Sequence, residues 1–232
     1  MSRIPVFEYH TKVSTIKLEL QNGEVKLIEI NPGWAFGTGS HITTKLCIKA
    51  LEEIFKERKL EKVLDVGCGS GVLAICAAAL GASTALAIDI DATSVGEARI
   101  NVNKNGFSSN IEVLCGSLEN TNHSFDLVIA NILIDSILLI SDELKSKLKS
   151  DGLLLVSGIR DTRKDEVIQR FRELGLSLDK ELCNEGWVAL SFKTHQQTAF
   201  FVYRKCPTSN LIRLPQTCEW NMGQIQSFEP CT

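Results

Sequence analysis

The clearest structural signal in the chain is the segment Val63-Leu64-Asp65-Val66-Gly67-Cys68-Gly69-Ser70-Gly71, in which a short apolar run leads into closely spaced glycines. The apolar run predicts a buried strand over Val63–Val66, and the apolar residues that follow predict a helix over Gly71–Leu80. Glycines let the backbone approach a ligand closely, and the N-terminus of a helix offers free N–H donors. We therefore expect a ligand-binding turn between a strand and its helix.

Strand-like and helix-like segments alternate from this turn onward. The predicted strands are Thr84–Asp89, Ile111–Cys115, Phe125–Ala130 and Leu153–Val156, the last opened by Gly152, and the predicted helices are Ala92–Asn105, Ile134–Leu148 and Asp161–Leu174. This rhythm predicts a parallel sheet with helices on both faces. Two closely spaced runs, Leu176–Glu181 and Trp187–Phe192, predict an antiparallel pair at one edge. The expected fold class is α/β, doubly wound, with a mostly parallel seven-stranded sheet and an antiparallel edge.

The flanking segments predict a division into three parts. Apolar runs at Thr15–Leu20 and Glu24–Ile30 surround an Asn-Gly pair and predict a β-hairpin, and Thr43–Lys59 has the periodicity of a helix. The last 38 residues hold three of the five prolines and show only a possible strand at Ala199–Tyr203. We expect a hairpin extension at residues 1–30, the main domain at 31–194, and a tail at 195–232.

Composition and charge argue against several classes of protein. The chain has 232 residues and a formal net charge of -3, so it has no basic excess to hold a nucleic acid directly. Met1–His10 lacks a signal core, and the uncharged run Val72–Ile88 is better interpreted as a buried helix and strand than as a membrane span. The eight cysteines form no C-x-x-C pair and lie near no histidine at zinc spacing. We expect reduced thiols, no metal and a cytoplasmic location.

The spacing of the glycines indicates which cofactor the turn holds. Asp89 ends the next predicted strand, where a carboxylate can accept hydrogen bonds from both ribose hydroxyls. A dinucleotide fingerprint fails, because the sixth position from Gly67 is Val72, which disfavours a nicotinamide dehydrogenase. Asp65 would repel a pyrophosphate and suits a cationic ligand, although the alternative is that it accepts hydrogen bonds from the loop backbone. The expected S-adenosylmethionine site comprises Asp65, Gly67, Gly69, Gly71 and Asp89.

Further segments carry a family resemblance. Val63–Ile75 is similar to the cofactor motif of class I methyltransferases. Asn31–Thr44 reads NPGWAFGTGSHITT and is similar to the P-G-x-A-F-G-T-G-x-H-x-T-T segment of ribosomal protein L11 methyltransferases, and Asn131-Ile132-Leu133 matches their N-I-L. Leu155–Ile159 and Glu185–Val188 also resemble that family. The resemblance covers Asn31 to Lys193.

The resemblance implies a Rossmann-like class I methyltransferase that methylates an amine nitrogen of a protein, such as a lysine or N-terminal amine of an L11-like ribosomal protein. It implies cofactor contacts from Thr44, Gly67, Asp89 and Asn131, and a loop of Phe36, Gly37 and Thr38 that folds over the cofactor. Asn131 is the expected catalytic residue. The residues after it, Ile132 and Leu133, replace the prolines of enzymes that methylate bases or glutamine, which leaves a flexible amine as the target. The alternative is that the Asn131 amide caps the following helix.

Two departures from the family leave other functions open. The family carries an N-terminal substrate-recognition domain where this chain shows only about a hairpin, and the family ends soon after the Trp187 strand. A small-molecule N-methyltransferase would share every cofactor residue, and a non-catalytic S-adenosylmethionine-binding regulator is a third possibility. His41 lies in the cofactor-loop segment and is a further candidate for the site, whereas His123 is expected in solvent. The sequence indicates neither the acceptor nor the oligomeric state.

Overall fold

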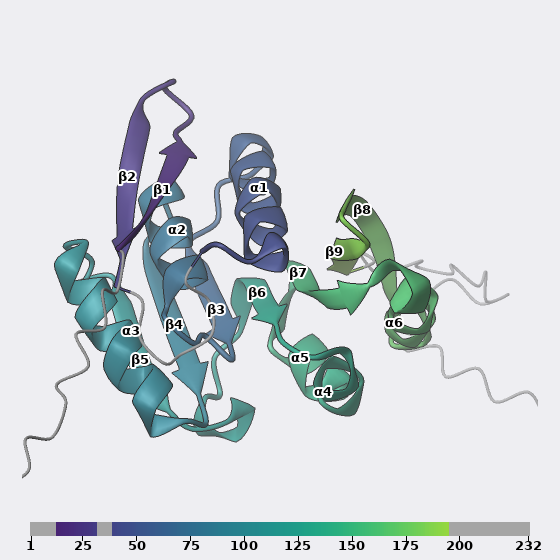
Figure 1. Cartoon of the computed structure of the whole chain (residues 1–232). Coiled ribbons are helices and arrows are strands. Elements are labelled where there is room, and N and C mark those ends of the chain that lie inside the picture. Colours follow the sequence, from purple (N-terminus) through teal and green to yellow (C-terminus); the bar gives the residue numbers. More distant parts are fainter. Residues whose placement is uncertain (1–12, 32–38, 195–232) are drawn as a thin grey trace, which may run out of the picture. The chain divides into compact units, whose positions relative to one another are not determined.

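The computed structural model of the chain describes residues 13–31 and 39–194. Its main feature is a seven-stranded sheet with the order β5-β4-β3-β6-β7-β9-β8 (Figure 1). Strands β3 to β7 run parallel, while β9 runs antiparallel to both β7 and β8. The strands are β3 (Lys62–Val66), β4 (Thr84–Asp89), β5 (Ile111–Cys115), β6 (Phe125–Asn131), β7 (Leu148–Arg160), β8 (Leu176–Asn184) and β9 (Trp187–Thr194). The predicted doubly wound sheet with an antiparallel edge is confirmed.

The order of the strands brings distant residues to one edge of the sheet. Strand β3 lies between β4 and β6, and Val66 pairs with Ile88 on one side and Ala130 on the other. The chain therefore winds away from β3 in both directions, and ligands of such sheets bind beyond the carboxyl ends of the strands at this point. Because the three strands end in register, Gly67, Asp89 and Asn131 meet at the same edge.

Helices cover both faces of the sheet. The helices are α1 (Ile42–Glu57), α2 (Val72–Leu80), α3 (Ala92–Lys104), α4 (Ile134–Leu139), α5 (Ser141–Ser146) and α6 (Lys164–Glu173), with single 3₁₀ turns at Leu118–Asn120 and Asp161–Arg163. One core cluster joins the sheet to α1, α2 and α3, and the other joins it to α4, α5 and α6. Successive residues of β3 alternate between the two clusters, since Val63 belongs to the first and Leu64 to the second.

The uncharged run Val72–Ile88 contains α2 followed by β4, as predicted. All residues of α2 except Ala79 are buried, because the sheet, α1 and the hairpin surround it. Such a helix is apolar on all sides for reasons of packing. No helix among the described residues is long and apolar enough to cross a membrane.

The predicted hairpin is also confirmed. Strands β1 (Ser14–Glu19) and β2 (Val25–Ile30) pair in register around a turn in which Gly23 adopts a φ of 81°. Leu18, Ile28 and Ile30 are buried in the same cluster as α1, α2 and α3. The boundaries proposed at residues 30 and 194 remain predictions, and the possible strand at Ala199–Tyr203 lies outside the described residues.

The prediction of one helix over Ile134–Leu148 is wrong. The segment forms two short helices that break at Ile140, and its last residue, Leu148, already begins β7. At the break, the Ser141 hydroxyl donates to the Leu138 carbonyl and accepts a hydrogen bond from Arg170. A serine hydroxyl bonded to a carbonyl of the preceding turn bends a helix. Because β7 already begins at Leu148, Gly152 lies inside this strand rather than at its start.

Candidate functional site

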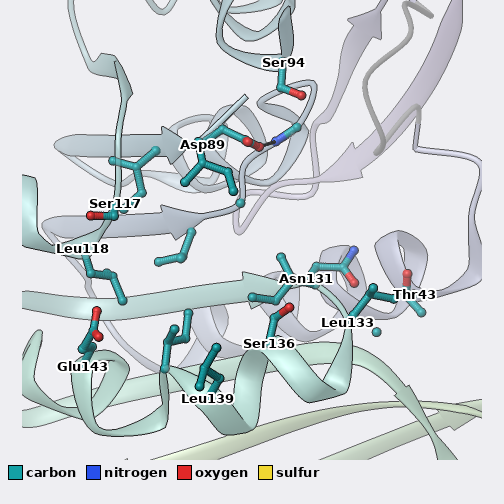
Figure 2. A pocket seen from close by; sticks show the side chains of 18 of the residues that line it. Thr43, Asp89, Ser94, Ser117, Leu118, Asn131, Leu133, Ser136, Leu139 and Glu143 are labelled. Carbon is teal, nitrogen blue, oxygen red and sulfur yellow. Dashed lines mark hydrogen bonds between the residues drawn. The ribbon is translucent and has the colours of Figure 1, made fainter. Parts of the chain in front are cut away.

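A cavity of about 730 Å³ lies at the edge of the sheet where β3, β4, β5 and β6 end (Figure 2). The loops after these strands form its floor, and α4, α5 and the start of α1 form its sides. This volume falls within the range of small-molecule sites in proteins. Of the predicted site residues, Gly67, Gly69, Asp89 and Asn131 line it.

The glycine turn after β3 depends on conformations that favour glycine. Gly67 and Gly69 have φ values of 66° and 53°. The N–H groups of Gly67 and Cys68 both donate to the Ile88 carbonyl, at 2.9 and 3.0 Å, which ties the turn to β4. A Cβ atom on Gly67 would lie 2.5 Å from Cγ2 of Ile132. A side chain at Gly67 would therefore push Ile132 out of the cavity wall.

Asp89 is held in a fixed orientation at the end of β4. Its Oδ2 accepts from the N–H of Gly69 at 2.9 Å, and its Oδ1 accepts from the N–H of Asp91 at 3.0 Å. Each carboxylate oxygen can accept more than one hydrogen bond, so both retain capacity for a ligand. The geometry suits the predicted contact with a pair of ribose hydroxyls.

Two predicted cofactor residues instead lie behind the glycine turn. The buried Asp65 accepts a hydrogen bond from the N–H of Ala74 in α2 at 3.0 Å and does not line the cavity. Burial raises the pKa of Asp65 to about 7; the hydrogen bond from Ala74 opposes this and the Asp89 charge adds to it. Gly71 begins α2 with a φ of 79°, and a Cβ there would lie 3.1 Å from the Ala98 side chain. Asp65 thus accepts from the first turn of α2, which follows the loop, whereas the alternative considered for it was a hydrogen bond from the loop backbone itself. The positions of both residues favour a structural role.

Asn131 presents an unsatisfied acceptor at the end of β6. Its Nδ2 donates to Thr44 Oγ1 at 3.4 Å, whereas its Oδ1 is buried and has no hydrogen-bond partner within the described residues. The amide does not cap α4, because the N-cap of that helix is Leu133 and no side chain bonds there. A buried acceptor without a partner is costly and rare, so it marks a place where a ligand can donate. Thr44 is buried behind Asn131, and Thr43 faces the cavity instead.

The rings of His41 and Trp187 line one end of the cavity, and of these two the sequence predicted His41 as a candidate for the site. His41 is the N-cap of α1, where its Nδ1 accepts from the N–H of Thr43 at 3.3 Å. The His41 ring meets the Trp187 ring edge to face, with centroids 5.4 Å apart. The Arg160 guanidinium stacks on the Trp187 ring at 3.9 Å. These contacts hold His41 and Trp187 together in the cavity wall.

Several residues in the cavity wall were missed by the sequence analysis. Ser117 and Leu118 lie in the loop after β5, behind Gly116, and their place after a predicted strand could have identified them. Ser136 and Glu143 face the cavity from α4 and α5, which no local motif indicates. Phe36, Gly37 and Thr38 lie outside the described residues, so the loop predicted to fold over the cofactor remains a prediction.

The charge of the cavity restricts its ligands. The described residues that line it include the carboxylates of Asp89 and Glu143 and no lysine or arginine. A pocket with this charge disfavours phosphates and suits cationic or neutral ligands. The charge of the cavity wall and the spacing of the glycines therefore both argue against a dinucleotide as the ligand.

Comparison with known proteins identifies the family. Residues 10–195 match the family model "Ribosomal protein L11 methyltransferase (PrmA)". This chain belongs to the ribosomal protein L11 methyltransferase family. It is 39% identical over 191 residues to the ribosomal protein L11 methyltransferase of Anoxybacillus flavithermus, and 42% identical over 171 residues to that of an Exiguobacterium species. These matches cover 82% and 73% of this chain but 58% and 54% of the relatives, so the chain spans little more than half of their length.

Solved structures agree with this family. The crystal structure of the ribosomal protein L11 methylase from Lactobacillus delbrueckii subsp. bulgaricus has a TM-score of 0.67 and 35% sequence identity, covering 72% of this chain and 86% of that one. The N-methyltransferase NodS from Bradyrhizobium japonicum, solved with S-adenosyl-L-homocysteine, has a TM-score of 0.55 at 17% identity and covers 65% of this chain and 86% of its own. The likeness to NodS shows a shared fold alone.

Proposed function

We propose that the cavity binds S-adenosylmethionine, the methyl donor that the family's name implies. Asp89 would hold the ribose hydroxyls, and Gly67 and Gly69 would allow the backbone to approach the methionine portion. The lack of a basic side chain among the described lining residues suits a ligand that carries a sulfonium and an ammonium group. The base would lie toward Ile90 and Leu118, whose apolar side chains suit a flat ring.

The reaction supported best is methyl transfer to an amine nitrogen of a protein. When bound, S-adenosylmethionine supplies a methyl group already activated on sulfur, so the protein must chiefly align a neutral nucleophile. Asn131 carries this proposal, since its Oδ1, which has no partner within residues 13–31 and 39–194, can accept a hydrogen bond from an amine N–H and leave the nitrogen lone pair directed at the methyl group. Thr44 holds the amide from behind. Trp187 and His41 would exclude water at the same end.

The substrate we propose is a ribosomal protein similar to L11, and a small amine is the alternative. Family membership and the names of the relatives favour the protein substrate. The direct test adds labelled S-adenosylmethionine and the purified chain to a cell lysate and separates proteins from small molecules. Label in a ribosomal protein fraction is expected. Label confined to small molecules would favour the alternative, and the absence of transfer despite cofactor binding would favour a non-catalytic regulator.

The variant Asn131→Ala tests the role of the unpartnered acceptor. Loss of a transition-state contact should lower turnover by more than it lowers affinity for S-adenosylhomocysteine. A matched variant, Thr44→Val, removes the partner behind Asn131 and should reduce turnover less. A melting temperature that falls while turnover per folded molecule holds would assign Asn131 a structural role only.

A further inference from the structure

The cavity contains a second carboxylate that the proposed function does not use. Glu143 projects from α5 into the cavity (Figure 2). Its backbone carbonyl accepts from Ser146, but its carboxylate makes no hydrogen bond or ion pair with any residue that the structure describes. The adjacent Asp142, in contrast, pairs with Arg170 and does not line the cavity. Glu143 is therefore a charged group available to a ligand.

The position of Glu143 indicates which part of a ligand it meets. Ser136, Leu139 and Glu143 follow one another at helical spacing along the wall formed by α4 and α5. Figure 2 shows Glu143 beyond Leu118 and Leu139, at the opposite end of the cavity from Asn131 and Thr43. The break at Ile140 lies between them, so Ser136 and Leu139 line the wall from α4 and Glu143 lines it from α5.

The proposed binding mode fixes the direction of the cofactor along this wall. The ribose lies on Asp89, and the methyl group must reach the Asn131 end for transfer. The base is the remaining part, so it extends from Asp89 past the loop after β5. That loop is tied to β4, because the N–H of Gly116 donates to the Asp89 carbonyl at 2.9 Å. Leu118 then forms the wall between Asp89 and Glu143 (Figure 2).

We infer that Glu143 selects the base, by accepting a hydrogen bond from the exocyclic amine of adenine. This inference rests on the proposed function. An ionised carboxylate can only accept, so it favours an amino group and opposes a carbonyl oxygen at the same position of a purine. The Ser117 hydroxyl, another polar group in the cavity wall, both donates and accepts and cannot make that distinction. Glu143 is therefore the specificity-determining residue for adenine over a 6-oxo purine such as hypoxanthine.

The test compares two ligands on three forms of the full chain. Calorimetry gives the dissociation constants of S-adenosylhomocysteine and S-inosylhomocysteine, which differ in the 6-substituent of the purine and in the proton that the 6-oxo form carries on N1, for wild type, Glu143→Gln and Asp142→Asn. A glutamine keeps the size of the side chain and can donate to a carbonyl oxygen. We expect Glu143→Gln to lower the preference for the adenine ligand by about tenfold or more. Asp142→Asn removes the neighbouring charge and should leave the preference unchanged.

The outcomes separate this inference from the proposed function. An unchanged preference in a Glu143→Gln protein that still binds S-adenosylhomocysteine would overturn the inference and leave the proposed function standing. A raised KM for the methyl acceptor with unchanged base preference would place Glu143 against the acceptor and also overturn it. Failure of the wild-type protein to bind either ligand would instead remove the proposed cofactor.

Discussion

Asp89 combines a structural contact with the proposed ribose contact in one side chain. Its two oxygens already hold the glycine turn and the start of α3 through the N–H groups of Gly69 and Asp91. A substitution must therefore be small, since a large one would disturb the turn and obscure the effect on binding. An amide in place of the carboxylate keeps the shape, but it removes the charge and half of the acceptor capacity.

Asp89→Asn should weaken the binding of S-adenosylhomocysteine by about 10- to 150-fold, the range for a lost hydrogen bond to a charged group. Asp91→Asn is the matched control. Asp91 caps α3 through the N–H groups of Thr93 and Ser94 and does not line the cavity, so its loss should lower stability but spare affinity. Equal affinities of Asp89→Asn and wild type by calorimetry would rule out the ribose contact.

Asp65 gives the protein a specific pH dependence. Its pKa rises from its ordinary value of 3.8 to about 7, chiefly because it is buried. Between about pH 4 and pH 7 the folded protein keeps this proton and the unfolded chain loses it, so the group lowers the free energy of unfolding by about 1.4 kcal/mol per pH unit. Asp65→Asn removes this loss and can still accept from Ala74.

Urea unfolding should therefore show Asp65→Asn gaining stability relative to wild type from pH 5 to pH 7, with a constant difference above pH 7. The other titrating groups are shared by the two proteins and largely cancel in the comparison, apart from the interaction of Asp65 with the Asp89 charge. A difference independent of pH would contradict the raised pKa. The same variant tests the remaining cofactor prediction for Asp65: unchanged affinity for S-adenosylhomocysteine is expected from its position behind the turn.

The sequence could predict which residues lie at the ends of strands, but it could not predict the directions of their side chains. Gly67, Asp89 and Asn131 line the cavity because each directly follows or ends an apolar strand of a parallel sheet. Asp65 precedes the end of its strand, and the alternation of side chains directs it to the α2 face together with Val63. That outcome requires knowing which helices cover which face. Glu143 reaches the cavity only through the packing of α5.

At the scale of elements, the most constrained contact joins β7 to the segment after β6. Gly158 lies at a register shift in the pairing of β7 with β9 and has a φ of 87°. A Cβ at this position would overlap the carbonyl oxygen of Ile132. The close approach of these two backbones positions Ile132 next to Asn131 in the cavity wall.

Gly158→Ala should therefore both destabilise the protein and weaken binding of S-adenosylhomocysteine. Gly175→Ala is the control, because Gly175 has a similar φ of 80° but an added Cβ would meet nothing within 4 Å. Both variants place an L-residue in the left-handed region, which should lower the free energy of unfolding by about 1–2 kcal/mol. Only the first should lose affinity by calorimetry. Equal affinities in the two variants would show that the Ile132 segment does not shape the site.

Helices and strands could be predicted where the residues at their ends favour a turn or a helix terminus. The Asn-Gly turn of the hairpin and Gly81 at the end of α2 are conformational requirements that appear in the sequence itself. The break at Ile140 carries no such signal, since the buried residues Ile134, Ile137 and Leu144 keep helical spacing through it. It depends on a tertiary hydrogen bond from Arg170, which belongs to a different helix.

At the scale of the whole molecule, the described strands of the sheet and the described lining of the cavity lie within the family-matched region. The last strand, β9, ends at Thr194, the family match ends at residue 195, and the described cavity lining extends from His41 to Trp187. A chain truncated after Thr194 should therefore fold, keep its melting temperature, and bind S-adenosylhomocysteine as tightly as the full chain. Calorimetry and thermal unfolding on matched preparations measure both. A soluble truncated chain that no longer binds would show that residues 195–232 contribute to the site, and the predicted domain boundary at residue 194 would then be wrong.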